Sequence, residues 1–103
     1  MTIIAERRLL YSIKNSSKRH PLKISISQPF TVTQDMVDFS IGDRLVGCKI
    51  ETIGLEKEYQ HVVYGMDSLQ AINMASNIDN YLEHLQKKYD LFWHSGEPYF
   101  DEE

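Results

Sequence analysis

Hydrophobic and polar residues alternate along the first two thirds of the chain, a pattern that is typical of β-strands. Four stretches place apolar side chains at every second position: residues 2–13, 22–27, 44–53 and 59–64. Strands with one apolar and one polar face belong to antiparallel sheets that bury a single side. Residues 30–43, which follow Pro29, are mixed and predict a loop with a short turn or strand.

The period of the pattern changes after residue 66. Apolar residues then recur in alternating steps of four and three: Ala71, Ala75, Ile78, Leu82, Leu85 and Tyr89. This spacing predicts one long amphipathic helix over residues 67–90. Asp67 is its predicted N-cap, and Gln70 is the second half of a capping box. Gly65 is expected to allow a tight turn out of the preceding strand.

Together these patterns predict a single α+β domain over residues 1–103. An antiparallel β-meander of about four to five strands occupies residues 1–66 and packs on one long C-terminal helix, residues 67–90. An acidic and aromatic tail, residues 91–103, follows the helix. The apolar stripe of the helix and the apolar strand faces are expected to bury each other.

The composition indicates the cellular compartment in which the protein is expected. Cys48 is the single cysteine, so no internal disulfide can form and a reducing compartment is expected. The chain has no apolar run long enough to cross a membrane, and Glu6, Arg7 and Arg8 interrupt any signal-peptide pattern. We therefore expect a cytoplasmic protein without a membrane anchor.

Charge is distributed unevenly around a net value of −4. Residues 1–33 hold six Lys or Arg against one acidic residue and carry +5, whereas residues 34–103 hold five against fourteen and carry −9. Such an asymmetry indicates a charged partner, or two solvated faces that attract each other across the fold. The mild net negative charge makes nucleic-acid binding the less favoured function.

One segment matches the core of a known modification site. Acyl and peptidyl carrier proteins carry Gly-x-Asp-Ser-Leu, whose serine takes a phosphopantetheine arm, and Asp67-Ser68-Leu69 resembles it. Those carriers are helical on both sides of the serine, whereas the residues before Asp67 alternate like a strand. The capping box explains Asp67 and Gln70 without a cofactor, and we favour that interpretation.

Other chemistry-bearing residues lack the spacing that a site requires. Asp35, Asp38 and Asp43 do not form an Asp-x-Asp-x-Asp-Gly calcium loop, and the four histidines share no metal-ligand spacing. The basic cluster at residues 18–20 is predicted to form the tip of a hairpin, and Cys48 is predicted to be a small core residue. We expect no enzyme, cofactor or metal site.

The tail has two interpretations. Trp93 and Tyr99 lie among acids around Gly96 and Pro98. Its aromatic side chains either fold back over the sheet edge, or act as anchors that present carboxylates to a basic partner.

Several segments, in order, resemble a family of small uncharacterised bacterial proteins: Ala5–Leu9, Ile24–Pro29, Cys48 in a strand ending at Ile53-Gly54-Leu55, and the Gly65–Ala71 segment Gly-x-Asp-Ser-Leu-Gln-Ala. The resemblance covers most of the chain and implies no established activity. Small acidic proteins of this kind are similar to immunity proteins of bacterial toxin–immunity pairs, including contact-dependent inhibition systems.

The resemblance and the charge pattern lead to the expectation of an immunity protein that covers the basic active site of a toxin, a nuclease by preference. The predicted contact residues are acidic or aromatic: Asp43, Glu56, Glu58, Trp93, Glu97, Tyr99, Asp101, Glu102 and Glu103. The alternative is a non-enzymatic structural or regulatory module that forms a homodimer through its sheet edge or helix. In either case a protein is the expected partner, and the free chain is expected to be a monomer or weak dimer.

Overall fold

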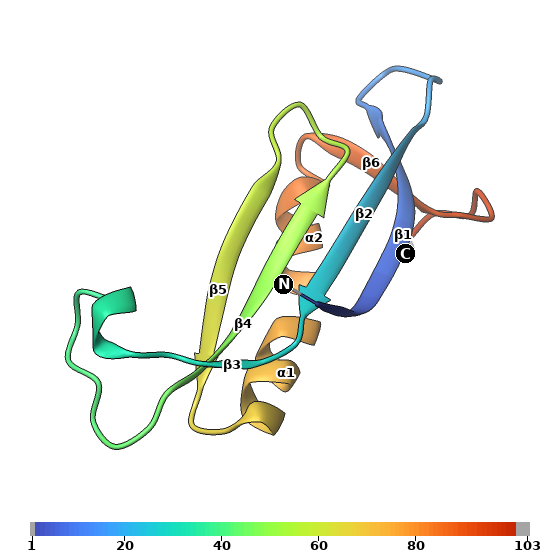
Figure 1. Ribbon diagram of the computed structural model, residues 1–103. Helices are drawn as coiled ribbons and strands as arrows, with labels where there is room; N and C mark the ends of the chain where they lie inside the picture. Colours follow the sequence, from blue (N-terminus) through green and yellow to red (C-terminus); the bar gives the residue numbers. More distant parts are fainter. Residues whose placement is uncertain (1, 101–103) are drawn as a thin grey trace.

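The structure, a computed structural model that describes residues 2–100, is an antiparallel sheet with a bent helical segment on one face (Figure 1). Its elements follow in this order: β1 (Ile3–Ile13), β2 (His20–Ser27), β3 (Phe30–Thr31), the 3-10 helix η1 (Gln34–Met36), β4 (Val46–Ile53), β5 (Tyr59–Gly65), α1 (Ser68–Ser76), α2 (Asp79–Leu85) and β6 (Tyr89–Trp93). The α+β class is therefore confirmed, with six strands in the sheet.

The sheet is built on a meander. The strands β1, β2, β4 and β5 lie side by side in chain order, and every pairing is antiparallel. The short strand β3 pairs with the start of β4, beyond the part of β4 that pairs with β2. The last strand, β6, returns to the opposite side of the sheet and pairs with β1. The edges of the sheet are thus β5 and β6.

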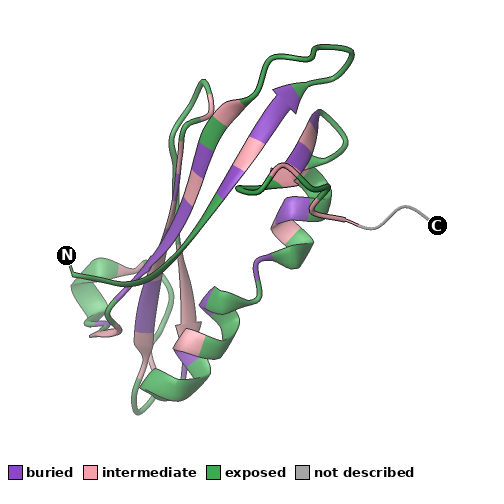
Figure 2. Ribbon diagram, turned by 90° about the vertical axis from the view of Figure 1, so that its right-hand side faces the viewer, coloured by how far each residue is buried: buried purple, intermediate pink, exposed green. Residues whose placement is uncertain are grey.

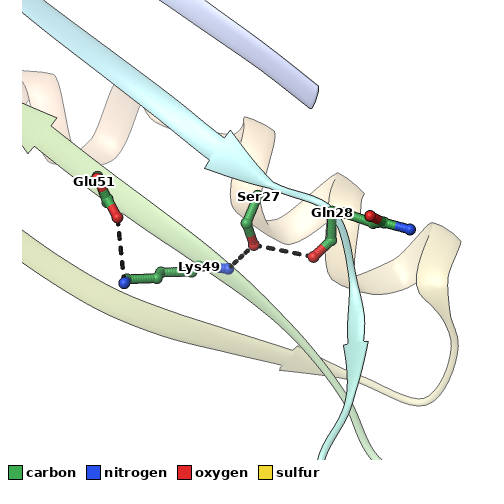
Figure 3. Close-up of polar contacts among 4 residues, drawn as sticks. All are labelled: Ser27, Gln28, Lys49 and Glu51. Carbon is green, nitrogen blue, oxygen red and sulfur yellow. Dashed lines mark hydrogen bonds and ion pairs between the residues drawn. The ribbon is translucent and has the colours of Figure 1, made fainter. Parts of the chain in front are cut away.

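A local irregularity lets β4 change partner from β3 to β2. Between the pairs Phe30↔Gly47 and Ile26↔Ile50, one side has an extra residue, as in a β-bulge. The Ser27 hydroxyl accepts a hydrogen bond from the Lys49 backbone N–H at 2.9 Å and donates one to the Gln28 carbonyl at 3.1 Å (Figure 3). A side chain therefore replaces the backbone partner that the bulge removes.

The core lies between one face of the sheet and the helices. Figure 2 shows buried residues on the sheet and on the side of the helical segment that faces it. The buried apolar residues of this cluster are Leu9, Tyr11, Leu22, Ile24, Ile26, Cys48, Ile50, Ala71, Ala75, Ile78, Leu82, Tyr89 and Leu91. The predicted mutual burial of the helical stripe and the strand faces is thus present.

The prediction of one long helix over residues 67–90 is wrong in two respects, the first being a break. The chain leaves helical geometry at Asn77, whose ψ is 67°, and the Ser76 hydroxyl bonds back to the Asn73 carbonyl. A new helix, α2, starts at Asp79 and ends at Leu85. The stripe persists across the break because Ala75 and Leu82 both face the sheet, and spacing alone does not distinguish a bent helix from a straight one.

The second correction concerns the residues after the helix. Lys87 and Lys88 lie in a turn rather than in a last helical turn, and Tyr89 belongs to strand β6. The helical spacing, which Tyr89 continues, predicts the helix end and the tail for residues 89–93. The segment has period-two alternation and three aromatic residues, a strand signal, and its partner β1 is supplied by the fold.

The junction between β5 and α1 contains the predicted helix cap. Its glycine, Gly65, has a different role from the predicted one. The Asp67 carboxylate accepts a hydrogen bond from the Gln70 N–H at 2.8 Å. The Gln70 side chain accepts one from the Met66 N–H at 2.6 Å, one residue earlier than in a standard capping box. Gly65 has no positive φ; it is buried, and a Cβ there would lie 2.7 Å from the Ala71 nitrogen. Close approach of strand and helix, rather than a special turn, requires glycine.

This contact predicts that Gly65→Ala lowers the free energy of unfolding by about 1–3 kcal/mol, because the strand end and α1 must separate. Gly42→Ala is the matched control, since a Cβ at Gly42 has nothing within 4 Å, and we expect a change within about 0.5 kcal/mol. Urea denaturation of the three proteins provides the measurement. Equal effects of the two substitutions would show that the close approach at Gly65 is unimportant.

Candidate protein-binding surface

Three of the predicted contact residues lie together beside β6. Trp93 ends the strand, Glu97 follows in a turn, and Tyr99 returns along the strand. The Trp93 N–H donates to the Glu97 carbonyl at 2.8 Å, and the Tyr99 N–H donates to the Leu91 carbonyl at 3.0 Å. Residues 94–100 therefore fold back and cover the outer edge of β6.

The Tyr99 side chain is engaged inside the molecule. Its hydroxyl accepts a hydrogen bond from the Arg7 guanidinium and donates one to the Asp79 carboxylate, each at 2.7 Å. Burial, followed by the hydrogen bond to Asp79, raises the pKa of this hydroxyl. The Arg7 guanidinium also lies 5.3 Å from the centre of the Trp93 ring. Arg7, the polar exception on the apolar side of β1, thus links the tail to the body of the protein.

Two more basic residues of the N-terminal part contact the same segment. The Lys14 ammonium lies 2.7 Å from the Asp90 carboxylate. The Arg19 guanidinium lies 3.7 Å from the centre of the Phe92 ring and donates to the Gly96 carbonyl at 3.1 Å. Part of the charge asymmetry along the sequence is therefore matched within the fold, between the N-terminal strands and the C-terminal segment.

The remaining predicted residues are separated from this group. Glu56 and Glu58 lie in the turn between β4 and β5 and flank Lys57. Asp43 precedes the start of β4, so it lies at the opposite end of that strand. Asp101, Glu102 and Glu103 fall outside the described residues. The structure does not assemble the predicted set into one surface.

A different group of acidic and apolar side chains is brought together by the segment between β3 and β4. We call residues 33–45 the acidic loop (Figure 1, lower left). It carries three exposed aspartates, Asp35, Asp38 and Asp43, and the exposed side chains of Met36 and Phe39. Surface loops held by a rigid scaffold often carry binding residues.

The acidic loop is held in place by its own residues. The Gln34 side chain donates to the Phe39 carbonyl at 2.7 Å and accepts from the Ile41 N–H at 3.0 Å, which joins the two halves of the loop. The Phe39 ring meets the Tyr64 ring of β5 edge-on, with centroids 5.7 Å apart. Phe39 is nevertheless 46% exposed and Met36 is 58% exposed. The loop thus presents apolar side chains in a defined position.

The aspartates of this loop have no cationic partner among residues 2–100. The ion pairs of the described chain lie elsewhere: Glu6 with Arg8, Lys14 with Asp90, and Lys49 with Glu51. Asp35 accepts a hydrogen bond from the Thr33 hydroxyl. Arg44 is the single basic residue of the loop. Unpaired carboxylates beside exposed apolar groups form a surface suited to a basic protein partner.

Sequence reasoning found Asp43 but missed the apolar members of this surface. The spacing of the three aspartates does not predict a metal site, and the mixed pattern of residues 30–43 predicts an ordinary loop that contains Met36 and Phe39. The available signal was the alternation of acid and large apolar side chains in Asp35-Met36-Val37-Asp38-Phe39 within a segment that forms no long strand.

Other chemistry-bearing residues are dispersed. Within residues 2–100, no group of three or more His, Cys, Asp and Glu side chains is placed to hold a metal ion. Ser68 is exposed at the first position of α1, directly after a strand and its turn. Cys48 is fully buried, and its thiol donates to the Ser27 carbonyl at 3.1 Å. No helix of the described chain is long and apolar enough to cross a membrane.

The environment of Cys48 gives a pH prediction. Burial raises the pKa of its thiol from the ordinary value of 9.0, and the hydrogen bonds with Ser27 oppose this in part. Only the unfolded thiol ionises readily above that value, so stability is retained below it and falls as the pH rises. Urea midpoints of wild type and Cys48→Ala should converge from about pH 8 to about pH 10. A difference that stays constant over this range would contradict the prediction.

The tail network predicts a specific cost for losing one hydroxyl. Tyr99→Phe removes the hydrogen bonds to Arg7 and Asp79, and we expect a loss of about 1 kcal/mol in the free energy of unfolding. Tyr59→Phe is the matched control, because Tyr59 is 51% exposed, and should change stability by less than about 0.5 kcal/mol. Equal losses in the two variants would rule out a specific role for the Tyr99 hydroxyl.

Comparison with known proteins gives no assignment: no protein-family model, no curated protein sequence and no solved structure matches this chain. The resemblance to small bacterial proteins and to immunity proteins stays a prediction. The features that bear on function are therefore the surfaces that the fold creates.

Proposed function

We propose that this protein is a cytoplasmic immunity protein that binds a cognate bacterial toxin and neutralises it by covering a basic active site. The observation that carries the proposal is the acidic loop, where three exposed aspartates without cationic partners in the described chain lie beside Met36 and Phe39. The proposal gives the protein an inhibitory role and no catalytic one.

Charge supports a nuclease as the target. A nuclease binds a polyanion, so its active-site cleft is rich in Lys and Arg. Carboxylates that face such a cleft compete with phosphate groups for the same cations. Opposite potentials also accelerate the encounter of two proteins, which favours an inhibitor that must act before the toxin reaches nucleic acid.

The apolar side chains supply what charge alone does not. Exposed carboxylates are well hydrated, and ion pairs at the rim of an interface add little affinity. Large apolar side chains that enter a pocket at the centre of an interface contribute most of the binding energy. Met36 and Phe39 lie between Asp35 and Asp43 along the loop, with Asp38 between them, so one segment offers both apolar and acidic side chains.

Contacts with the rest of the fold restrict the conformations of the acidic loop. Its N-terminal side follows β3, and the Val32 N–H donates to the Leu45 carbonyl at 2.9 Å, which closes the base of the loop. The Gln34 side chain and the contact between Phe39 and Tyr64 fix its tip. A loop that is ordered before binding loses less conformational entropy in the complex.

The other predicted contacts lie on separate surfaces. Glu56 and Glu58 sit beside Lys57, and Trp93 and Tyr99 take part in the tail network. They remain predictions, and the following experiment distinguishes them from the acidic loop.

The proposal predicts that the product of the adjacent toxin gene co-purifies with this protein and that cells co-expressing both survive. Asp38→Lys combined with Asp43→Lys should lower affinity by about tenfold or more at low salt, mainly through slower association, and should abolish protection. Affinity measured by calorimetry at two salt concentrations, together with growth of the co-expressing cells, tests this. Phe39→Ala should weaken binding with little salt dependence.

Glu56→Lys combined with Glu58→Lys is the matched control, because it makes the same charge change at the opposite end of β4. The control should retain protection. Protection lost in the control and kept in the loop variant would move the contact to the β4–β5 turn. A neighbouring gene without a toxin domain, together with no protection against candidate nucleases, would end the proposal.

A further inference from the structure

The two edges of the sheet are treated differently by the fold. The outer edge of β6 is covered by residues 94–100, through the hydrogen bonds of Trp93 and Tyr99 and a bridge between Phe92 and Pro98. Within residues 2–100, β5 pairs with β4 alone, so its other edge is open (Figure 1). An open edge exposes a row of unpaired N–H and C=O groups that another strand can use.

The sequence of β5 contains none of the residues that usually block such pairing. Its seven residues, Tyr59-Gln60-His61-Val62-Val63-Tyr64-Gly65, include no Lys, Arg, Asp, Glu or Pro. Proteins protect open edges with charges, prolines or bulges that prevent a second strand from adding. Neither these devices nor a segment paired with the outer edge of β5 is present in the described chain; the acidic loop contacts β5 through the rings of Phe39 and Tyr64.

We propose that β5 is the interface of a homodimer, in which two copies pair their β5 strands antiparallel and join their sheets into one. A two-fold axis at Val62 pairs all seven residues. Val62 then faces its copy, Gln60 faces Tyr64, and Tyr59 faces Gly65. This arrangement puts no two like charges directly opposite each other.

Apolar and charged side chains at the two ends of β5 come together in this orientation. Antiparallel pairing carries Met66 and Asp67, which follow Gly65, to the partner's start of β5. There a groove of about 320 Å³ is lined by apolar and basic side chains: Leu55, Lys57, Tyr59, Leu85, Lys88 and Tyr89, with Glu56 and His84. Asp67, the N-cap of α1, lies two residues beyond the end of β5, and the two-fold axis brings it near the partner's Lys57, which lies two residues before the start of β5 between Glu56 and Glu58. Met66 is 62% exposed and free to enter the groove.

The position of α1 is compatible with the same β5–β5 dimer. Met74 of α1 is 48% exposed, and helical spacing places it on the opposite flank of α1 from Ser76, which lines a groove over β1 and β2. The Met74 flank therefore faces β5. Pairing through β5 brings two such flanks toward each other above the joined sheet and covers Met74. The dimer goes beyond the proposed function and leaves Asp38 and Asp43 of the acidic loop outside the pairing, whereas Phe39 packs against Tyr64 beside the paired strands.

Sedimentation equilibrium over a wide concentration range tests the proposal, with the expected dimer at twice the 12.0 kDa of the chain. Val62→Lys should give a monomer with an unchanged circular dichroism spectrum, because it places two charges at the axis. Asn73→Lys, on the exposed side of α1, is the matched charge control and should remain dimeric. A monomeric wild type, or a dimer that survives Val62→Lys, would overturn the proposal.

The register has its own tests. Val62→Cys should form an interchain disulfide on oxidation, since opposed residues of paired strands lie about 5 Å apart, whereas Gln60→Cys should not, since the two copies are separated by about 13 Å along the strands. Cys48 does not interfere because it is buried. The reverse pattern would reject the proposed register.

The end contact is tested by a double-mutant cycle. Lys57→Glu should weaken the dimer by roughly tenfold. Asp67→Asn, which keeps the helix cap, should remove most of that effect. Equal effects of Lys57→Glu in both backgrounds would show that Lys57 does not face Asp67. These measurements need no toxin, so their failure leaves the acidic-loop proposal unaffected. Loss of protection in the variant with Asp38→Lys and Asp43→Lys leaves the dimer unaffected.

Discussion

The structure depends on the mutual burial of one face of a sheet and one side of a bent helical segment. Ala71, Ala75 and Leu82 are fully buried against Leu9 and Leu22 and their neighbours. Neither partner is stable alone, because a short helix is marginal in water and an exposed apolar sheet face associates with other chains. The two small residues of α1 let it approach β4 and β5 closely, and Gly65 extends this close approach to the junction.

This arrangement determines where the remaining segments of the chain lie and which of their surfaces stay exposed. With one sheet face covered by helices, the chain crosses from the β5 side to the β1 side and adds β6 there. The segment after β6 then returns along that edge, where the Arg7 and Asp79 side chains hold Tyr99. The C-terminal segment, expected to be a partner-binding tail, thereby becomes part of the scaffold as far as it is described. In the described chain, the aspartates of the acidic loop remain without a cationic partner and the outer edge of β5 without a paired strand.

The main errors of prediction share one physical cause. A 3–4 spacing reports which side of a segment is buried and says nothing about continuity, so Asn77 could interrupt the helix without disturbing the stripe. Tyr89 fits that spacing by coincidence and joins β6 because β1 offers it a row of backbone partners. For the candidate site, Asp43 was identified by its charge. Met36 and Phe39 were missed, since exposure in a loop is settled by the elements that surround it.

The sequence by itself determined the α+β class, the four meander strands, the Asp67 cap and the apolar stripe, because each of these follows from local periodicity and local hydrogen bonding. The tertiary structure alone decided the placement of β6, the role of Arg7 beside Tyr99, and the exposure of Met36 and Phe39 in the acidic loop. These depend on contacts between residues far apart in the chain. Such contacts form only when the helical segment packs on one face of the sheet and the chain after it pairs with β1.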